Sequence, residues 1–347
     1  MSQLFTIDED IHIPIYKQIL AGFESAIESG ELQVGGYLPS MNELASMLNI
    51  SKETAKKVYS ILRERGLIDS IHGKGFFVLP RREEHKLKIF MLLDKLSQYT
   101  QILYDSFVKR LGSRGEVTIY LYNQDINAFE DFIGRSLDED SRFDYYLVTP
   151  HFPLDATTQA RALKAMKRIP NRKLVMLDKW MRSLPGNYGA VYQDMANDIY
   201  DCLGGVVEDL RRYNKMHVVT LPSSLYAPII SESVTRFAKD NDINIEFHYE
   251  INEDIMQRDD VYLLLNGQLG IGLAEIARIA KAKGLDIGKD IGLIAYNESY
   301  LNEIILGGLT TVSTDFKQMG YLAADMILAH NLHKIHCDFK MTRRNTF

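Results

Sequence analysis

The sequence predicts an α/β protein with two parts: a small winged helix-turn-helix, and a larger two-lobed domain with parallel sheets. The first observation is the stretch Gly36 to Val78, which holds two short helical patterns, a tight connection and a glycine-tipped hairpin. The second is an alternation of short apolar runs with helical patterns from Leu87 onward, as expected for parallel strands joined by helices. A chain of 347 residues is long enough for two or three domains.

Capping signals mark the first two helices of the N-terminal part. Pro14 is expected to open a helix whose apolar residues recur at spacings of three and four between residues 15 and 27, and Gly30 is expected to end it. Ser40 and Glu43 fit the S-x-x-E capping box of a second helix, because each side chain can bond the other residue's backbone N–H. These signals predict two short amphipathic helices.

The third helix is predicted to begin after Ser51, which can act as its N-cap. At 100° per residue, Ala55, Val58, Tyr59 and Leu62 fall on one side of this helix. Polar residues fall on the other side, among them Lys56 and Lys57. After Gly66, apolar residues at 67–68 and 76–78 are predicted to form two strands around the tip at 72–75.

The charge of this region indicates a nucleic-acid partner. Residues 50–82 carry eight Lys and Arg against three Asp and Glu, whereas the whole chain has a formal net charge of -6. A helix that is buried on one side and basic on the other can enter the major groove of DNA. A solvated surface helix would explain the lysines alone, but not lysines combined with caps, turn and hairpin. The expected DNA contacts are Ser51, Lys52, Thr54, Lys56, Lys57 and Lys74.

The order G-x-L-P-S-x-x-E-L-A, S-K-x-T-x-K-K, R-G-L-I and G-K-G-F-F-V resembles the DNA-binding domain of the GntR family of bacterial regulators over residues 10–79. The resemblance adds Ser40, Asn42, His72 and Gly73 to the expected DNA contacts. Asn42 stands where the family often has an arginine for phosphate, and Phe76 replaces a usual threonine in the wing. Both departures bear on the operator that is preferred.

Three segments organise the chain: a DNA-binding domain at 1–79, a charged linker at 80–86 and a two-lobed domain at 87–347. In the last segment, strands are predicted at 88–93, 117–122, 145–150, 173–178, 217–221, 243–249, 261–266 and 291–296, with a helix at 97–112. Two sheet lobes would place a cleft at the carboxyl ends of their strands, which is the expected site for a small molecule.

The segment from 288 to 328, GKDIGLIAYNESYLNEIILGGLTTVSTDFKQMGYLAADMIL, resembles the C-terminal signature of the periplasmic-binding-protein-like effector domain of lac-repressor-type regulators. The resemblance includes an L-T-T-V turn at 309–312 and the M-G pair at 319–320. LVMLDKW at 174–180 and VYQDM at 191–195 are similar to crossover segments of that fold. The likeness covers residues 86–347. A GntR-type DNA-binding domain joined to this effector domain resembles one arrangement found among sugar-responsive repressors.

Matching motif positions to strand ends predicts the residues that bind the effector. They are Ser97, Gln98, Tyr99, His151, Phe152, Lys179, Trp180, Asp194, Asn266, Asn297 and Glu298. Aromatic faces with carboxylates and amides suit a polyhydroxylated ligand. Core packing, helix capping or an exposed loop remain alternatives for single members. Ile230 and Gly267 stand where related domains carry an arginine and an aspartate, so the ligand's identity does not follow from the family.

Other functions find less support in the sequence. No nucleophile elbow, zinc-protease motif, Walker loop or Cys/His cluster is present, and Cys202 and Cys337 stand far apart, so we expect no enzyme, cofactor or metal site. No apolar run is long enough to span a membrane, and a cytoplasmic protein is expected. The predicted function is a dimeric, sugar-responsive repressor on a palindromic double-stranded DNA operator. The alternatives are a cytoplasmic carbohydrate-binding protein, or a sugar-acting enzyme with an accessory DNA-binding domain.

Overall fold

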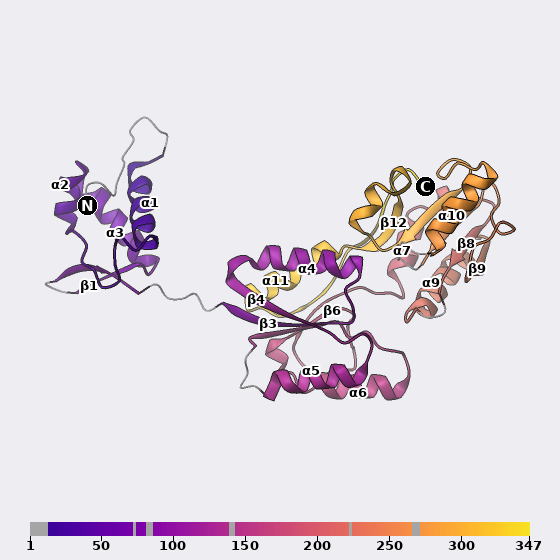
Figure 1. The fold of residues 1–347 in the computed structure, drawn as a ribbon, viewed down its shortest axis with the longest axis horizontal. Coiled ribbons are helices and arrows are strands. Elements are labelled where there is room, and N and C mark those ends of the chain that lie inside the picture. Colours follow the sequence, from indigo (N-terminus) through magenta and orange to yellow (C-terminus); the bar gives the residue numbers. More distant parts are fainter. Residues whose placement is uncertain (1–12, 72–73, 81–85, 139–142, 222–223, 266–270) are drawn as a thin grey trace. The chain divides into compact units, whose positions relative to one another are not determined.

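The computed structural model describes residues 13–71, 74–80, 86–138, 143–221, 224–265 and 271–347 (Figure 1). Backbone proximity divides the chain into two compact units: the N-terminal unit, Met1–His85, and the C-terminal unit, Lys86–Phe347.

The N-terminal unit contains three helices and an antiparallel hairpin. They are α1 (Ile15–Glu28), α2 (Met41–Met47), α3 (Lys52–Glu64), β1 (Ile68–Ile71) and β2 (Gly75–Val78). Their apolar faces meet in one core that includes Phe23, Leu44, Val58 and Tyr59. The Tyr59 hydroxyl donates a hydrogen bond of 2.6 Å to the Pro39 carbonyl, which ties α3 to the start of α2. The predicted winged helix-turn-helix is therefore the observed fold.

The predicted caps of α2 and α3 are present. Ser40 accepts from the backbone N–H of Glu43, and the Glu43 carboxylate accepts from the backbone N–H of Ser40 at 2.7 Å. These bonds, with the backbone contact first, lower the pKa of Glu43 below its usual value. Ser51 accepts from the backbone N–H of Thr54 at 3.0 Å. Capping bonds thus satisfy donors that the first helical turn leaves without partners.

The C-terminal unit consists of two lobes, each built on a sheet of six strands. In the first lobe the strand order is β13-β7-β6-β5-β3-β4, and all of its pairs are parallel. The strands are β3 (Leu87–Leu93), β4 (Gly115–Leu121), β5 (Tyr145–Val148), β6 (Leu174–Asp178), β7 (Gly189–Tyr192) and β13 (Lys334–His336). Helices α4 (Gln98–Leu111) and α11 (Phe316–Leu328) cover one face, and α5 (Ile126–Asp138) and α6 (Ala156–Met166) cover the other (Figure 1).

The second lobe has the strand order β14-β12-β11-β10-β8-β9, in which β14 alone runs antiparallel. Its strands are β8 (Met216–Val219), β9 (Ile245–His248), β10 (Val261–Leu264), β11 (Gly292–Tyr296), β12 (Thr310–Thr314) and β14 (Phe339–Thr342). Helices α7 (Asp198–Gly204), α8 (Val207–Leu210) and α9 (Ala227–Asp240) pack on one face, and α10 (Ile271–Lys283) packs on the other. Short 3-10 turns lie at Gly112–Arg114, Asn171–Lys173, Tyr300–Glu303 and Ile305–Gly307.

The chain passes between the lobes three times: after β7, after β12, and between β13 and β14. Backbone hydrogen bonds hold these crossings together. Cys337 donates to the carbonyl of Tyr192 at 2.8 Å, and Asp315 donates to that of Asp338 at 2.8 Å. The crossings therefore form one bonded group of segments at the junction of the lobes.

The predicted α/β architecture with parallel sheets is confirmed, with one local error. The L-T-T-V segment is not a turn, because Thr310–Thr314 is the strand β12 and pairs with β11 and β14. The M-G pair has a packing role on α11. A Cβ added at Gly320 would lie 2.4 Å from the Leu103 carbonyl oxygen on α4, so only glycine allows this close approach. Within the described residues, no helix is long and apolar enough to cross a membrane.

Candidate effector cavity and nucleic-acid interface

A cavity of about 540 Å³ lies between the two lobes of the C-terminal unit. Its lining follows the carboxyl ends of β3, β4, β5, β6 and β7 in the first lobe and of β8, β10 and β11 in the second. Parallel strands end at a common edge of their sheet, so residues distant in the sequence converge there. The volume lies in the range of sites for small organic ligands.

Two buried carboxyl groups define the chemistry of the cavity. The exposed fractions of Asp94 and Asp178 are 5% and 1%. Asp94 Oδ1 and Asp178 Oδ2 have no hydrogen-bond partner among the described residues. His151 Nε2 lies 3.0 Å from Asp178 Oδ2, which is within ion-pair distance but lacks hydrogen-bond geometry, so neither atom has a hydrogen-bond partner. Buried acceptors without donors cost free energy, which a ligand's hydroxyl groups would recover.

Tyrosines supply the aromatic part of the lining. Burial, followed by the charges of Asp178 and Asp94, raises the pKa of Tyr99 and of Tyr226 well above the usual value. Burial, followed by the charge of Asp178, also raises the pKa of Tyr296 well above its usual value. All three side chains therefore remain protonated phenols at neutral pH. They combine an apolar ring face with a hydroxyl donor, which suits a ligand with both C–H and O–H groups.

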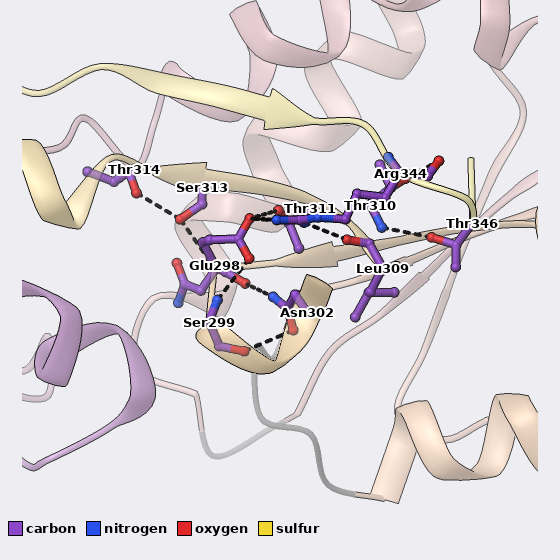
Figure 2. A network of polar contacts seen from close by, with 11 residues as sticks. Glu298, Ser299, Asn302, Leu309, Thr310, Thr311, Ser313, Thr314, Arg344 and Thr346 are labelled. Carbon is purple, nitrogen blue, oxygen red and sulfur yellow. Dashed lines mark hydrogen bonds and ion pairs between the residues drawn. The ribbon is translucent and has the colours of Figure 1, made fainter. Parts of the chain in front are cut away.

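Glu298 lines the cavity but its carboxylate is already engaged (Figure 2). Its Oε2 accepts from Thr311 Oγ1 at 2.7 Å and from both terminal nitrogens of Arg344 at 3.1 Å. Its Oε1 accepts from the backbone N–H of Ser299 at 3.0 Å. Arg344 follows β14, so the end of the chain holds this wall of the cavity in place.

Gln193 links the cavity to the crossings between the lobes. Its Nε2 donates to Asp178 Oδ1, and its Oε1 accepts from Thr314 Oγ1 at 2.9 Å. Gln193 follows β7 and Thr314 ends β12, so each belongs to a segment that passes between the lobes. A ligand bound at Asp178 would therefore lie one hydrogen bond away from this junction.

The structure brings six of the predicted effector residues to the cavity. They are Ser97, Gln98, Tyr99, His151, Asn297 and Glu298. Asn297 Oδ1 is a further buried acceptor without a partner among the described atoms. Lys179 lies just outside the lining, with Nζ 5.0 Å from the ring centroid of Tyr226, and burial lowers its pKa. Asn266 falls outside the described residues.

Besides Lys179, three predicted residues do not line the cavity, and each makes contacts elsewhere. Phe152 is fully buried and packs edge-on against Phe129. Trp180 donates from Nε1 to the Tyr188 hydroxyl at 3.0 Å. Asp194 accepts from the backbone N–H of Ala196 at 3.2 Å and from the side chain of Asn197. These residues stand next to strand ends in the sequence, but their side chains point into the core or along the loop.

Sequence reasoning missed five polar or aromatic residues of the lining: Asp94, Asp178, Gln193, Tyr226 and Tyr296. A signal was available for the first two. Each aspartate directly follows a run of buried apolar residues, LLD at 92–94 and MLD at 176–178, and so stands at a strand end. The prediction instead assigned effector binding to residues that follow these aspartates. Gln193 and Tyr226 carry no comparable signal, because only the meeting of the two lobes brings them to the same cavity.

The N-terminal unit presents its predicted DNA contacts on the surface. Ser40, Asn42, Ser51, Lys52, Lys56, Lys57 and Lys74 are exposed, and Thr54 is half-buried. On α3 the three lysines are exposed, whereas Ala55, Val58, Tyr59 and Leu62 are buried. Lys57 Nζ lies 3.8 Å from the ring centroid of Tyr16, whereas Lys56 has no such aromatic contact in the described structure. His72 and Gly73, at the wing tip, fall outside the described residues.

The sequence of the N-terminal unit is similar to those of known bacterial regulators. Residues 15–78 match the family described as "Bacterial regulatory proteins, gntR family". The repressor NagR of Bacillus subtilis is 37% identical over 82 residues, which are 24% of this chain and 34% of NagR. The mannosyl-D-glycerate system repressor MngR of Escherichia coli is 27% identical over 126 residues, 36% of this chain and 47% of MngR. The chain thus matches about a third to a half of the length of these two relatives.

Solved structures resemble the remainder of the chain. A dimeric Lac repressor aligns with a TM-score of 0.60 at 17% identity, over 75% of this chain and 98% of that one. The trehalose repressor of Escherichia coli aligns with a TM-score of 0.58 at 10% identity, over 74% and 100%. At such identities the likeness shows the fold alone. The N-terminal unit therefore matches the gntR family over residues 15–78, and the C-terminal unit shares its fold with the effector domains of the lac and trehalose repressors.

Proposed function

We propose that this protein is a transcriptional repressor whose affinity for its DNA operator is controlled by a sugar or sugar derivative in the cavity of the C-terminal unit. The observation that carries the effector proposal is the pair of buried carboxyl groups, Asp94 and Asp178, whose unpaired oxygens belong to one cavity.

The chemistry of the lining favours a polyhydroxylated ligand. Asp94, Asp178 and Asn297 offer three unpaired acceptor oxygens, and a sugar offers several hydroxyl donors. The rings of Tyr226 and Tyr296 offer apolar faces for the C–H side of a sugar ring. Glu298 is bound to Arg344, so we assign it a positioning role. The identity of the sugar is left to experiment, since the relatives' ligands belong to proteins that match only part of this chain.

The N-terminal unit is proposed to read double-stranded DNA with α3. Lys52, Lys56 and Lys57 would reach phosphates or guanine edges, while Ser51 and Thr54 would contact phosphate oxygens near the N-terminus of the helix. Ser40, Asn42 and Lys74 would add backbone contacts from α2 and from the wing. The gntR family match and the repressor names of the relatives support this role.

The proposed control runs through the segments that cross between the lobes. A ligand that binds better when the lobes are closed shifts the population toward closure. The Asp178–Gln193–Thr314 contacts would pass this shift to the crossings and change how two DNA-binding units fit a palindromic operator. Because the coupling is reciprocal, bound DNA must lower the affinity for the effector by the same factor by which bound effector lowers the affinity for DNA.

A homodimer is proposed because a palindromic operator requires two reading units. Four apolar side chains support a pairing surface on the second lobe: Tyr300, Leu301, Ile304 and Leu306 are between 38% and 72% exposed. Exposed apolar groups clustered in one short segment are typical of interaction sites. Sedimentation of Ile304→Glu beside wild type tests this, and an unchanged dimer would place the interface elsewhere.

Thermal unfolding of the full chain against a panel of sugars, sugar acids and sugar phosphates tests the effector proposal. A ligand that binds only the native state raises the free energy of unfolding by RT ln(1 + [L]/Kd), and the unfolding temperature rises with it. Any stabilising sugar is then added to an operator-binding titration, in which we expect weaker binding to DNA. Asp178→Asn is the matched control. If the sugar stabilises this variant as much as it stabilises the wild type, the effector does not bind at Asp178. Turnover of the sugar would indicate an enzyme instead.

A further inference from the structure

We propose that the second lobe binds a divalent transition-metal ion, with Zn²⁺ as the best match, through His217, Glu246 and His248. The site is separate from the effector cavity and does not depend on the proposed function. His217 lies on β8, and the other two residues lie on the neighbouring edge strand β9. One ligand atom from each residue falls within 4.8 Å of the others.

The atoms that would bind the metal face one another. His217 Nδ1 is 2.9 Å from His248 Nε2, and His248 Nε2 is 4.0 Å from Glu246 Oε1. Strand pairing sets His217 directly opposite Glu246 and places His248 two residues further along β9, on the same face of the sheet. Two imidazoles and one carboxylate form a ligand set that zinc accepts, with water in the fourth position.

Two of the three ligands are held from behind in the way that metal ligands require. His217 Nε2 is 2.9 Å from Asp260 Oδ2, and its ring stacks on Tyr262 with centroids 4.9 Å apart. A proton shared with Asp260 on Nε2 leaves the Nδ1 lone pair directed at the site. Glu246 is held by Lys215, whose Nζ lies 2.8 Å from Oε2, and this leaves Oε1 for the metal.

All three ligands must adjust to accept zinc, and Glu246 Oε1, which lies 4.0 Å from His248 Nε2, must move closer by roughly 0.7 Å. Two nitrogens bound tetrahedrally at 2.0–2.1 Å lie about 3.3 Å apart, so the imidazoles must separate by roughly 0.4 Å. His248 and Glu246 can move, because β9 is an edge strand and the Glu246 side chain is half exposed. The ammonium of Lys215 opposes the metal's charge and sets an upper limit on affinity.

The competing explanation is a chain of hydrogen bonds, Asp260–His217–His248, that satisfies a buried histidine without any metal. The two explanations differ in what they predict for added zinc. A metal ion would replace the proton between the imidazoles and link the edge strand β9 to β8. His217 lies in the amino half of β8 and Asp260 precedes β10, whereas the cavity follows the carboxyl ends of these strands. Metal binding is therefore expected to leave sugar affinity unchanged.

Titration of the metal-free, untagged full chain with Zn²⁺, in competition with a chromophoric chelator, tests the proposal. We expect one zinc per chain, a rise in unfolding temperature, and visible absorption of tetrahedral type when Co²⁺ replaces zinc. His248→Ala should weaken zinc at least tenfold, and Asp260→Asn, which removes no ligand, should weaken it by about 10-fold to 100-fold.

His333→Ala is the matched control, because His333 is an exposed histidine outside the cluster. It should bind zinc as the wild type does. The proposal is overturned if zinc affinity survives His248→Ala in protein whose circular dichroism is native, if Co²⁺ gives no tetrahedral absorption, or if His333→Ala removes the binding. The last outcome would assign zinc to the histidines at 330–336 instead. Because β9 is an edge strand, His248→Ala is expected to fold, and Glu246→Gln provides a second variant that removes a charged ligand without changing its size.

Discussion

The DNA-reading surface and the effector cavity proposed for this protein are built in opposite ways. The DNA-reading surface comes from one continuous stretch of about forty residues, and most of its side chains are exposed. The effector cavity draws its lining from strand ends between Asp94 and Glu298, and its decisive groups are buried. A local surface can be inferred from capping and periodicity, whereas a convergent cavity depends on which strands become neighbours.

The same contrast predicts different responses to mutation. Exposed lysines act through several similar contacts with phosphates, so their effects should be graded and should depend on salt. Buried acceptors act singly and without screening, so one substitution should remove most of the response to the effector.

The largest effect is expected when α3 loses its positive charge. Replacing Lys52, Lys56 and Lys57 with alanine should weaken operator binding roughly 100-fold or more, because phosphate and base contacts are lost together. The slope of log affinity against log salt should fall by about 0.9 for each lost phosphate contact. Fluorescence anisotropy over a salt series measures both quantities.

Lys281→Ala, an exposed lysine on α10, is the control for charge alone. An unchanged salt slope in the triple variant would mean that α3 does not contact DNA. Comparing Lys56→Ala with Lys57→Ala sharpens the test, because Lys57 lies against Tyr16 and has to leave that ring to reach a phosphate.

The next effect concerns the buried acceptor of the cavity. Asp178→Asn keeps the size of the side chain but removes its charge, and a hydrogen bond to a charged group contributes about 1.5–3 kcal/mol. Effector affinity should therefore fall by roughly 10-fold to 100-fold, with operator affinity unchanged in the absence of effector. Calorimetry measures the first quantity and anisotropy the second, and the exposed Asp201→Asn is the control. Wild-type affinity in Asp178→Asn would contradict the proposed site.

A smaller effect should separate binding from response. Thr314→Val removes the hydroxyl that donates to Gln193 and keeps the shape of the side chain. The lost bond contributes about 0.5–1.5 kcal/mol, so the effector's influence on operator affinity should fall by a factor of roughly 2 to 10. Effector affinity without DNA should change less. Thr118→Val, at an exposed threonine on β4, is the control and should respond as the wild type does. If the response of Thr314→Val is as strong as that of the wild type, the coupling takes another route.

Asp315 should make stability depend weakly on pH. Burial raises its pKa, but hydrogen bonds from Lys340 and from the backbone of Gln318 outweigh burial, and the net pKa is lowered. A lowered native pKa stabilises the fold above the unfolded pKa of about 3.9, and this stabilisation is lost as the pH falls through the native pKa. Asp315→Asn should lower the free energy of unfolding by on the order of 1 kcal/mol at pH 6, and the difference should shrink toward pH 3. A difference that is constant across this range would refute the assignment.

The smallest effect is expected at Trp180, which lies outside the cavity. Trp180→Phe removes the donor to Tyr188 but no cavity group, so effector affinity should stay within about twofold of the wild type. Calorimetry with the stabilising sugar provides the measurement. A tenfold loss of effector affinity in Trp180→Phe would mean that Trp180 belongs to the binding site.

Particular residues show where prediction from sequence stops. The capping box of Ser40 and Glu43, the N-cap at Ser51 and the strand at 174–178 are local patterns, and the structure confirms them. The family resemblance predicts a turn at the L-T-T-V segment, but Thr310–Thr314 is a strand that is paired on both sides. Phe152 and Asp178 both stand at strand ends, and only packing decides that one fills the core while the other faces the cavity.

By itself, the sequence determined the winged helix-turn-helix, the alternation that predicts parallel sheets, and the basic face of α3. These features depend on hydrogen bonds between residues close in the sequence and on the regular spacing of apolar residues along each helix or strand. Tertiary structure alone decided that Asp178, Gln193 and Thr314 form one chain of hydrogen bonds. It also decided that His217 on β8 faces His248 on the neighbouring strand β9. Such groups are far apart along the chain, and the pairing of strands and the meeting of two lobes bring them within a hydrogen bond of one another.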